Sequence, residues 1–262
     1  MIIDCHTHIF EAGAGGPFGL PASARDLVRH MDEQRVDLSV VLPLAGIASN
    51  EFVHRECAAF PGRLLGLYNP DFTAPARTIQ KMEEFFDRYS PRGLKIHPRY
   101  QGVTVKDSVV SEVFHWAQER GVVILIDVFL HGPSLDNPDL HPVAYHPIAQ
   151  RLPELRMILA HSGGYKMMEA FMVAKSNPNV YLDLSFTPAY FNGSSVGEDC
   201  GFLCRRLPPG RVLYGSDFPY VPFAESVEHA RRFMRGAAES LSNQFWGAGA
   251  AALFGIAEDS GI

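Results

Sequence analysis

The first chemically suggestive feature of the sequence is a pair of histidines near its start. Residues 2–8 read IIDCHTH, so His6 and His8 follow an apolar pair and stand two positions apart. Side chains two apart on a strand point to the same side, so the two imidazoles converge if this segment is a strand. Two charged imidazoles repel each other, whereas two neutral ones can share a metal ion. The spacing therefore predicts a divalent metal site.

Ionisable residues also follow several other apolar runs. They are Lys95 and His97 in GLKIHP, Asp127 in VVILID, His161 in MILAHSGG, Asp183 in VYLDLS and Asp217 in VLYGSDFPY. Taken alone, such a histidine or aspartate is more often a hydrogen-bonded structural residue or a helix cap. Burying unpaired charge is costly, however, and these groups recur at the ends of at least five runs. We expect them to converge on a metal ion or an anionic substrate.

Eight apolar runs must position these side chains. The runs cover residues 1–5, 38–42, 64–68, 93–96, 122–126, 156–160, 180–184 and 211–215. Most are apolar on both faces, as strands covered on each side are. Helical patterns lie between them, as in residues 76–89 (Ile79, Met82, Phe86 and Tyr89) and residues 107–120 (Val109, Val113, Trp116 and Ala117).

This alternation predicts an α/β fold, a (β/α)₈ TIM barrel formed as a single domain by residues 1–262. An open doubly wound sheet is the alternative, although no Gly-x-Gly-x-x-Gly follows a strand to suggest nucleotide binding. Long loops after the first and fifth strands, residues 11–23 and 129–147, are expected to lie over the mouth of the barrel as lids.

Composition limits the classes of partner. The chain has a formal charge of −6, which argues against nucleic acid as a main partner. No apolar run is long enough for a membrane span, and no secretory signal is recognisable. Four cysteines favour a reducing compartment, and we expect Cys200 and Cys204 to be buried thiols rather than a redox pair. The sequence thus predicts a cytoplasmic protein with a small-molecule substrate. The oligomeric state stays open between a monomer and a homodimer, and Phe85-Phe86 would face either a partner subunit or the core.

At these residues the sequence resembles the amidohydrolase superfamily. It is most similar to the amidohydrolase-related branch of metal-dependent hydrolases, lactonases and the amino-carboxymuconate-semialdehyde decarboxylase group. The resemblance is carried, in the family order, by DCHTH, GLKIHP, ILAHSGG, NVYLDLS, VLYGSDFPY and AALFGI. It implies a distorted barrel with one or two divalent ions, often zinc. It also implies that His6, His8 and Asp217 are ligands, that Asp217 exchanges a proton with the attacking water, and that His161 is a base, a polarising group or a further ligand.

The sequence departs from the branch at two places. Asp127 stands where the branch typically has a histidine, so the metal site either keeps a carboxylate ligand or has become metal-free, as in some lactonases of the group. Gly249 and Ala252 replace an asparagine and an arginine of the terminal helix, which puts a structural contact in doubt.

The roles of the residues that follow the fourth strand stay open. Lys95 is expected to bind a substrate carboxylate or carbonyl, or else to pair with Asp127. His97 could compensate for the missing histidine, and both His97 and Asp127 are taken as substrate-binding residues. Arg99 is either an anion-binding residue or a surface cation.

The function predicted is hydrolysis of a small carboxylate, ester, lactone or amide substrate. One divalent ion, expected to be zinc, would activate a water, and Asp217 or His161 would move its proton. The alternatives are a non-oxidative decarboxylase or metal-free lactonase of the same fold, and a barrel that binds a ligand without turning it over.

Overall fold

The computed structural model describes residues 1–11, 19–131 and 135–257. Within them, the eight expected strands are present at close to their predicted positions. They are β1 (Ile3–Thr7), β2 (Leu38–Val41), β3 (Leu64–Gly66), β4 (Gly93–Ile96), β5 (Val123–Asp127), β6 (Met157–Ala160), β7 (Val180–Asp183) and β8 (Val212–Leu213). The first strand starts later than predicted and includes His6, which the sequence had placed just beyond its end.

The strands pair in parallel and in chain order, as β1-β2-β3 and β4-β5-β6-β7-β8. Backbone hydrogen bonds join the two groups on both sides. Lys95 N donates to Tyr68 O at 2.8 Å between β3 and β4, and Asp217 N donates to His6 O at 2.8 Å between β8 and β1. The ring of strands is therefore continuous, and the prediction of a (β/α)₈ barrel is confirmed over the open doubly wound sheet.

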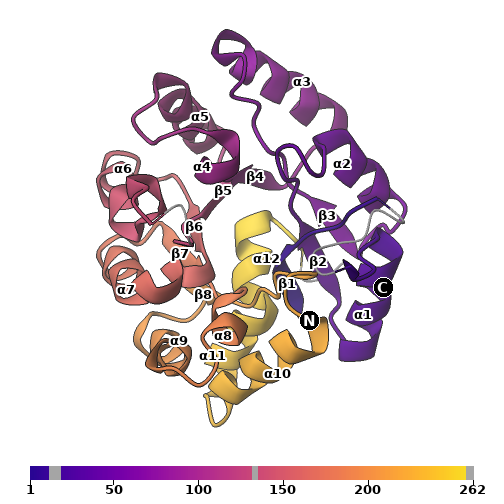
Figure 1. The fold of residues 1–262 in the computed structure, drawn as a ribbon, viewed down its shortest axis with the longest axis vertical. Coiled ribbons are helices and arrows are strands. Elements are labelled where there is room, and N and C mark those ends of the chain that lie inside the picture. The colour runs from indigo at the N-terminus through magenta and orange to yellow at the C-terminus, as the bar shows by residue number, and fades with distance from the viewer. Residues whose placement is uncertain (12–18, 132–134, 258–262) are drawn as a thin grey trace.

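Helices surround the strands (Figure 1). They are α1 (Ala24–Gln34), α2 (Asn50–Ala58), α3 (Thr78–Tyr89), α4 (Pro98–Gln101), α5 (Ser108–Glu119), α6 (His146–Arg151), α7 (Met167–Ser176), α8 (Thr187–Tyr190), α9 (Ser195–Arg206), α10 (Phe223–Met234), α11 (Glu239–Asn243) and α12 (Gly249–Phe254). The signal that starts a helix is local: Ser23 and Asp26 form a capping box at the first turn of α1.

No helix in the described parts of the chain is both long and apolar enough to span a bilayer.

The apolar faces pack where their periodicity predicts. Val109, Val113 and Trp116 of α5 are buried, and so is Phe85 of α3. Phe86 is partly buried and packs on Trp116, with ring centroids 4.8 Å apart, so both phenylalanines contact the core. Cys200 and Cys204 are buried free thiols, and so are Cys5 and Cys57.

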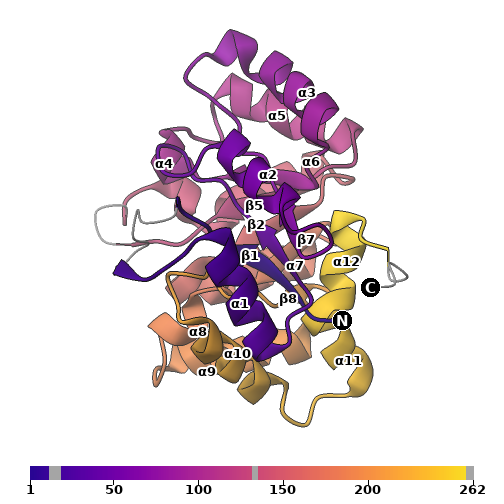
Figure 2. The ribbon, with the colours of Figure 1, turned by 90° about the vertical axis from the view of Figure 1, so that its right-hand side faces the viewer.

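A second apolar cluster fills the barrel interior. It joins Ile3, Val40, Leu125 and Ile158 of the strands to Phe254 of α12. In Figure 2, α12 lies on one side of the molecule and α4 on the other. The side of α4 is the C-terminal mouth of the strands, because α4 follows the end of β4.

The long loops are only partly described. Residues 12–18 of the first loop and 132–134 of the second lie outside the described residues, so the lid role stays a prediction. The second loop contains two 3₁₀ turns, Pro138–Leu140 and Pro142–Tyr145. It is held down by the buried Tyr145, whose hydroxyl donates to Asp139 O at 2.9 Å.

The junction of β1 with the segment after β8 depends on Asp4. This side chain is fully buried, and its Oδ1 accepts from His6 N at 3.1 Å and from Ser216 N at 2.9 Å. Burial raises the pKa of Asp4 to about 7, against the lowering effect of its hydrogen bonds with Ser216 and His6. One side chain thereby satisfies two backbone donors on both sides of the closure.

Replacing Asp4 tests this role. Asp4→Ala leaves two buried N–H groups without an acceptor, and each such group costs about 1–3 kcal/mol. We expect urea unfolding followed by circular dichroism to show a loss of about 2–6 kcal/mol, on the same basis. Asp4→Asn keeps an acceptor oxygen and should lose clearly less. Equal stability of the alanine variant and the wild type would show that Asp4 does not hold the junction.

Candidate metal centre and active site

A β-bulge in β1 directs His6 into the barrel mouth. Between the pairs Asp4↔Ser39 and Thr7↔Val41, β1 has one residue more than β2. Neighbouring residues of a regular strand point to opposite faces of the sheet. Cys5 and His6 are neighbours, yet both lie on the inner face: Cys5 belongs to the interior cluster, and His6 lines the cavity at the mouth. The extra residue changes the direction of the following side chains, as bulges do.

Three atoms of His6, His8 and Asp217 converge on one point. His6 Nε2 and His8 Nε2 each lie 3.4 Å from Asp217 Oδ1. The two imidazole centroids are 5.3 Å apart. All three residues are buried, so water does not screen the arrangement well.

The partners of the other ring nitrogens assign the protons. His6 Nδ1 lies 3.0 Å from Asp183 Oδ2, and His8 Nδ1 lies 3.0 Å from Leu42 O. Since a carboxylate and a carbonyl only accept, each Nδ1 carries the hydrogen and each Nε2 presents a lone pair. Burial, followed by the charge of Lys95, lowers the pKa of His6 to about 4, so this ring is neutral near pH 7.

The three convergent atoms are therefore all acceptors. His6 Nε2 is buried and has no hydrogen-bond partner among the described residues. Two imidazole nitrogens and a carboxylate oxygen repel one another unless a cation lies between them, and this donor set suits zinc. Each ligand histidine also has the outer acceptor that metal-binding histidines usually have. The residues therefore fit a divalent ion.

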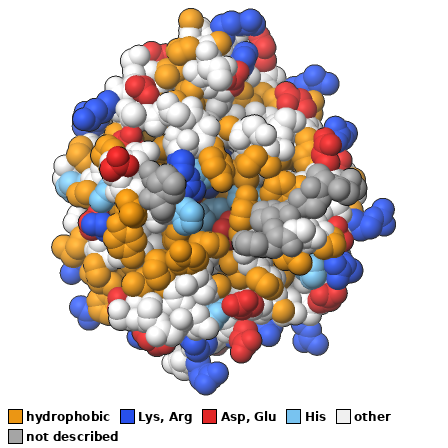
Figure 3. Space-filling view, in the orientation of Figure 1, with side chains coloured by type: hydrophobic (Ala, Val, Ile, Leu, Met, Phe, Trp, Pro, Cys, Tyr) orange, Lys and Arg blue, Asp and Glu red, His pale blue; other side chains and the backbone are white. Residues whose placement is uncertain are grey.

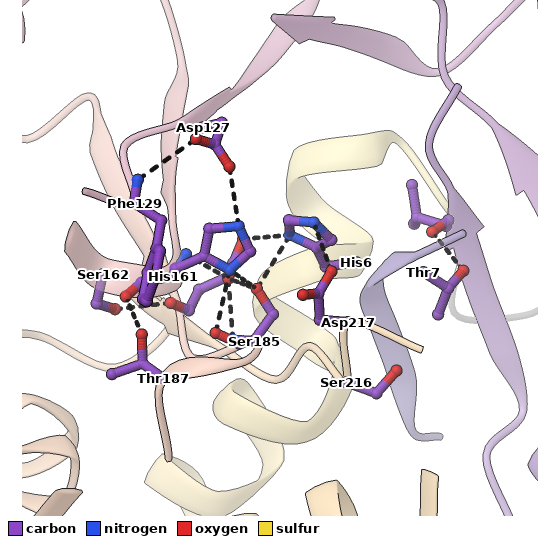
Figure 4. Close-up of polar contacts among 12 residues, drawn as sticks. His6, Thr7, Asp127, Phe129, His161, Ser162, Ser185, Thr187, Ser216 and Asp217 are labelled. Carbon is purple, nitrogen blue, oxygen red and sulfur yellow. Dashed lines mark hydrogen bonds and ion pairs between the residues drawn. The ribbon is translucent and has the colours of Figure 1, made fainter. Parts of the chain in front are cut away.

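Asp183 and Ser185 connect this centre to His161. Asp183 Oδ1 accepts from His161 N at 2.9 Å and from Ser185 N at 3.0 Å. Ser185 Oγ donates to Asp183 Oδ1 and lies 3.1 Å from His6 Nδ1 and 2.9 Å from His161 Nδ1. Figure 4 shows Ser185 between the two rings. Burial raises the pKa of Asp183, but its contacts with His6, His161 and Ser185 lower it more, which keeps this carboxylate ionised.

His161 is held between acceptors on both sides. Its Nε2 lies 3.1 Å from Asp127 Oδ2, and its Nδ1 lies 3.2 Å from Ser185 O. Burial lowers the pKa of His161, but the hydrogen bond with Asp127 and the nearby charge of Asp217 raise it above the usual value. Protons on both nitrogens satisfy both contacts, so the arrangement favours an imidazolium.

Asp127 is a partner of histidines in this structure. Besides His161, it faces His97, whose Nε2 lies 3.5 Å from Asp127 Oδ2. Burial raises the pKa of Asp127, but the neighbouring His97 and the hydrogen bond of His161 hold it well below its usual range. In the described chain, the groups with the spacing of a metal site combine His6 with His8 and Asp217, or with His161 and Asp183; neither includes Asp127 or His97.

Strained backbone aims two of these side chains. His161 and Asp217 follow β6 and β8 with φ values of 58° and 59°. The left-handed region costs a non-glycine residue roughly 1–3 kcal/mol and is typical of functional sites. The strain is offset by contacts such as Asp217 N to His6 O, described above.

These residues surround a cavity of about 570 Å³ at the mouth. Figure 3 shows it as a hollow near the centre of this face, with histidine and Lys or Arg side chains at its edge. The sequence-predicted site residues that line it are His6, His8, Lys95, His97, Asp127, His161 and Asp217. Of the two roles left open for Lys95, the ion pair with Asp127 is not formed, since no carboxylate of the described residues lies within 4.0 Å of its Nζ.

Some contributions were not predicted from the sequence. The apolar lining of Phe129, Phe186 and Tyr220 gave no motif, because isolated aromatic residues look like core. Asp183 was seen after its strand, but its role as the acceptor of His6 requires coordinates. His131 lines the cavity as well, whereas His141 faces Glu169, with 3.7 Å between Nδ1 and Oε2.

Comparisons with known proteins agree with this architecture. A family model described as amidohydrolase matches residues 3–256. No curated protein matches the sequence. A TIM-barrel protein from Bordetella bronchiseptica is 16% identical and superposes with a TM-score of 0.80, covering 97% of this chain and 98% of its own.

Two further solved structures are similar. An amidohydrolase from Burkholderia multivorans with bound zinc is 16% identical, with a TM-score of 0.74 and coverage of 98% of this chain and 100% of its own. The 5-carboxyvanillate decarboxylase from Sphingomonas paucimobilis is 17% identical, with a TM-score of 0.73 and coverage of 98% and 99%. At these identities the likeness shows the fold.

Metal affinity tests the outer contact of His6. Asp183→Asn removes the charge that fixes the Nδ1 proton, and loss of such contacts typically weakens metal binding by about 10–100-fold. We expect zinc titration against a competing chelator to show that loss. Asp139→Asn, which neutralises a buried carboxyl outside the centre, should bind zinc like the wild type. Unchanged affinity in Asp183→Asn would separate Asp183 from the centre.

Proposed function

The chain belongs to the amidohydrolase family, whose model matches residues 3–256, and from that premise we propose that it is a metal-dependent hydrolase of a small carboxylate, ester, lactone or amide. The observation that carries the proposal is the convergence of His6 Nε2, His8 Nε2 and Asp217 Oδ1 without a proton between them. We propose that these three atoms hold one divalent ion, and the nitrogen-rich donor set favours zinc.

An ion in this position would polarise a substrate carbonyl and make a water more acidic. Asp217 is the group suited to accept the proton of that water. Burial raises its pKa, but the neighbouring imidazoles of His8, His6 and His161 lower it further, so Asp217 stays ionised. Its side chain also lines the cavity, where a bound substrate can contact it.

His161 would have the opposite role. An imidazolium that contacts Asp127 and Ser185 has no free lone pair with which to accept a proton, but it can give one up. We propose that it donates to the leaving oxygen or nitrogen as the bond to the carbonyl carbon breaks. Its ring lines the same cavity as Asp217, so one substrate can contact both.

The charged state of His161 also favours a second candidate, a non-oxidative decarboxylase. In that reaction the carbon–carboxylate bond breaks, carbon dioxide leaves, and the carbon that lost it takes up a proton. A proton-bearing His161 would supply it. The two reactions differ in products: hydrolysis of an ester, lactone or amide generates a new carboxylic acid, whereas decarboxylation consumes one.

Chelation and two variants test the proposal. We expect metal removal to abolish turnover and zinc to restore it. Asp217→Asn and His161→Gln should each lower kcat/KM by about 10²–10⁴-fold, the usual contribution of a proton-transfer group. The control is His115→Gln, which changes an exposed histidine of α5.

The assay uses a panel of lactones, esters and aromatic acids with product analysis. Full activity in metal-free protein would reject the metal-dependent mechanism and favour the metal-free lactonase. Release of carbon dioxide, with no new acid formed, would select the decarboxylase.

A further inference from the structure

Two cations that line the cavity have no carboxylate partner among the described residues. Lys95 and Arg99 both line it, and Lys95 is only 1% exposed. Among residues 1–11, 19–131 and 135–257, no carboxylate lies within 4.0 Å of either side-chain charge. Arg99 Nε is buried and lacks a hydrogen-bond partner in the same residues. A buried cation without a partner is costly unless a ligand supplies the counter-charge.

The two cations differ in their surroundings. Lys95 lies on β4 and feels the charges of Asp127, Asp183 and Asp217, which oppose the lowering of its pKa by burial. Arg99 lies farther along the chain, on α4, and is only partly buried. Its charge adds to the lowering of the Lys95 pKa, so the two cations repel each other. A guanidinium stays charged, so Arg99 keeps its positive charge at the cavity wall.

Ring contacts fix the position of Arg99. Its guanidinium carbon lies 5.3 Å from the centroid of Tyr100. The Tyr100 ring in turn stacks on His97 at 4.1 Å, with an interplanar angle of 17°. Because His97 contacts Asp127, this stack attaches the Arg99 end of the cavity to the end that holds His161.

The remaining lining is largely flat and apolar. Phe129 and Phe186 pack edge to face, with centroids 5.1 Å apart, and Tyr220 packs against His8 at 5.6 Å. All three rings line the cavity. Aromatic walls favour planar unsaturated ligands, which can stack against them or meet their edges.

We propose that Arg99 is a specificity-determining residue that binds a second carboxylate of the substrate, so the substrate is a planar unsaturated or aromatic acid with two anionic groups. One anionic or carbonyl group lies at the end with Lys95 and the metal ligands, and the other pairs with Arg99. This inference rests on the proposed function for the reacting end, but it concerns binding and does not require that turnover be observed.

The test compares the binding of flat probes by calorimetry. Isophthalate and terephthalate carry two carboxylates on a benzene ring, and benzoate carries one. A charge-assisted hydrogen-bonded pair is worth about 10–100-fold in affinity. We expect zinc-loaded wild type to bind at least one of the diacids more tightly than benzoate by about that factor, with the preference shrinking at high salt.

Variants assign the preference to Arg99. Arg99→Gln should lose most of the preference for the diacid while its affinity for benzoate changes less than about twofold, and Arg99→Lys should keep part of it. The control is Arg92→Gln, which changes an exposed arginine before β4, at the opposite end of the strand. Circular dichroism and zinc content of every variant show whether fold and metal centre are intact.

Two results would overturn the inference. One is a wild type that binds neither diacid more tightly than benzoate. The other is an Arg99→Gln variant that weakens diacid and benzoate equally, which would make Arg99 a shaping residue. Neither result bears on the proposed metal centre. If the protein failed to bind zinc but still preferred the diacid, the proposed function would be rejected and the role of Arg99 would stand.

Discussion

The mutual repulsion of three acceptors at the β1–β8 closure is the constraint on which the site depends. His6 and His8 come from the first strand and Asp217 from the segment after the last, and the hydrogen bond from Asp217 N to His6 O brings the two segments together. Closing the barrel therefore creates the site. Asp4 supports this closure, because its side chain accepts hydrogen bonds from the backbone N–H groups of His6 and of Ser216, the residue before Asp217.

Asp127, at the position after β5 where the resemblance leads us to expect a histidine, is itself a partner of histidines. A carboxylate there contacts His161 at 3.1 Å and His97 at 3.5 Å, and does not join the three convergent acceptors. The negative charge of Asp127 stabilises a proton on His161, which suits this histidine to donate a proton rather than to accept one. We infer that the strand-five position in this chain sets the proton state of a neighbour instead of supplying a ligand.

Much of the fold could be predicted because its signals are local. Runs apolar on both faces mark the eight strands, and the stripe of Val109, Val113 and Trp116 marks the buried face of α5. Site residues could be named because polar groups at strand ends violate the apolar pattern around them. The pairings among them could not: the sequence left Lys95 either as a substrate-binding residue or as a partner of Asp127, and only the structure shows that no described carboxylate lies within 4.0 Å of its Nζ. The bulge in β1 also has no recognisable local signal.

The sequence by itself determined the element order, the parallel barrel and the set of ionisable groups at one end of it, because strand and helix periodicity and strand-end chemistry are properties of short segments. The tertiary structure alone decided which atoms meet. It placed the Nε2 atoms of His6 and His8 against Asp217, and it placed His161 between Asp127 and Ser185. It left Lys95 and Arg99 without an ion pair to any carboxylate of the described residues. Those outcomes depend on distances of a few ångströms between residues far apart in the chain, and such distances arise only when the barrel closes.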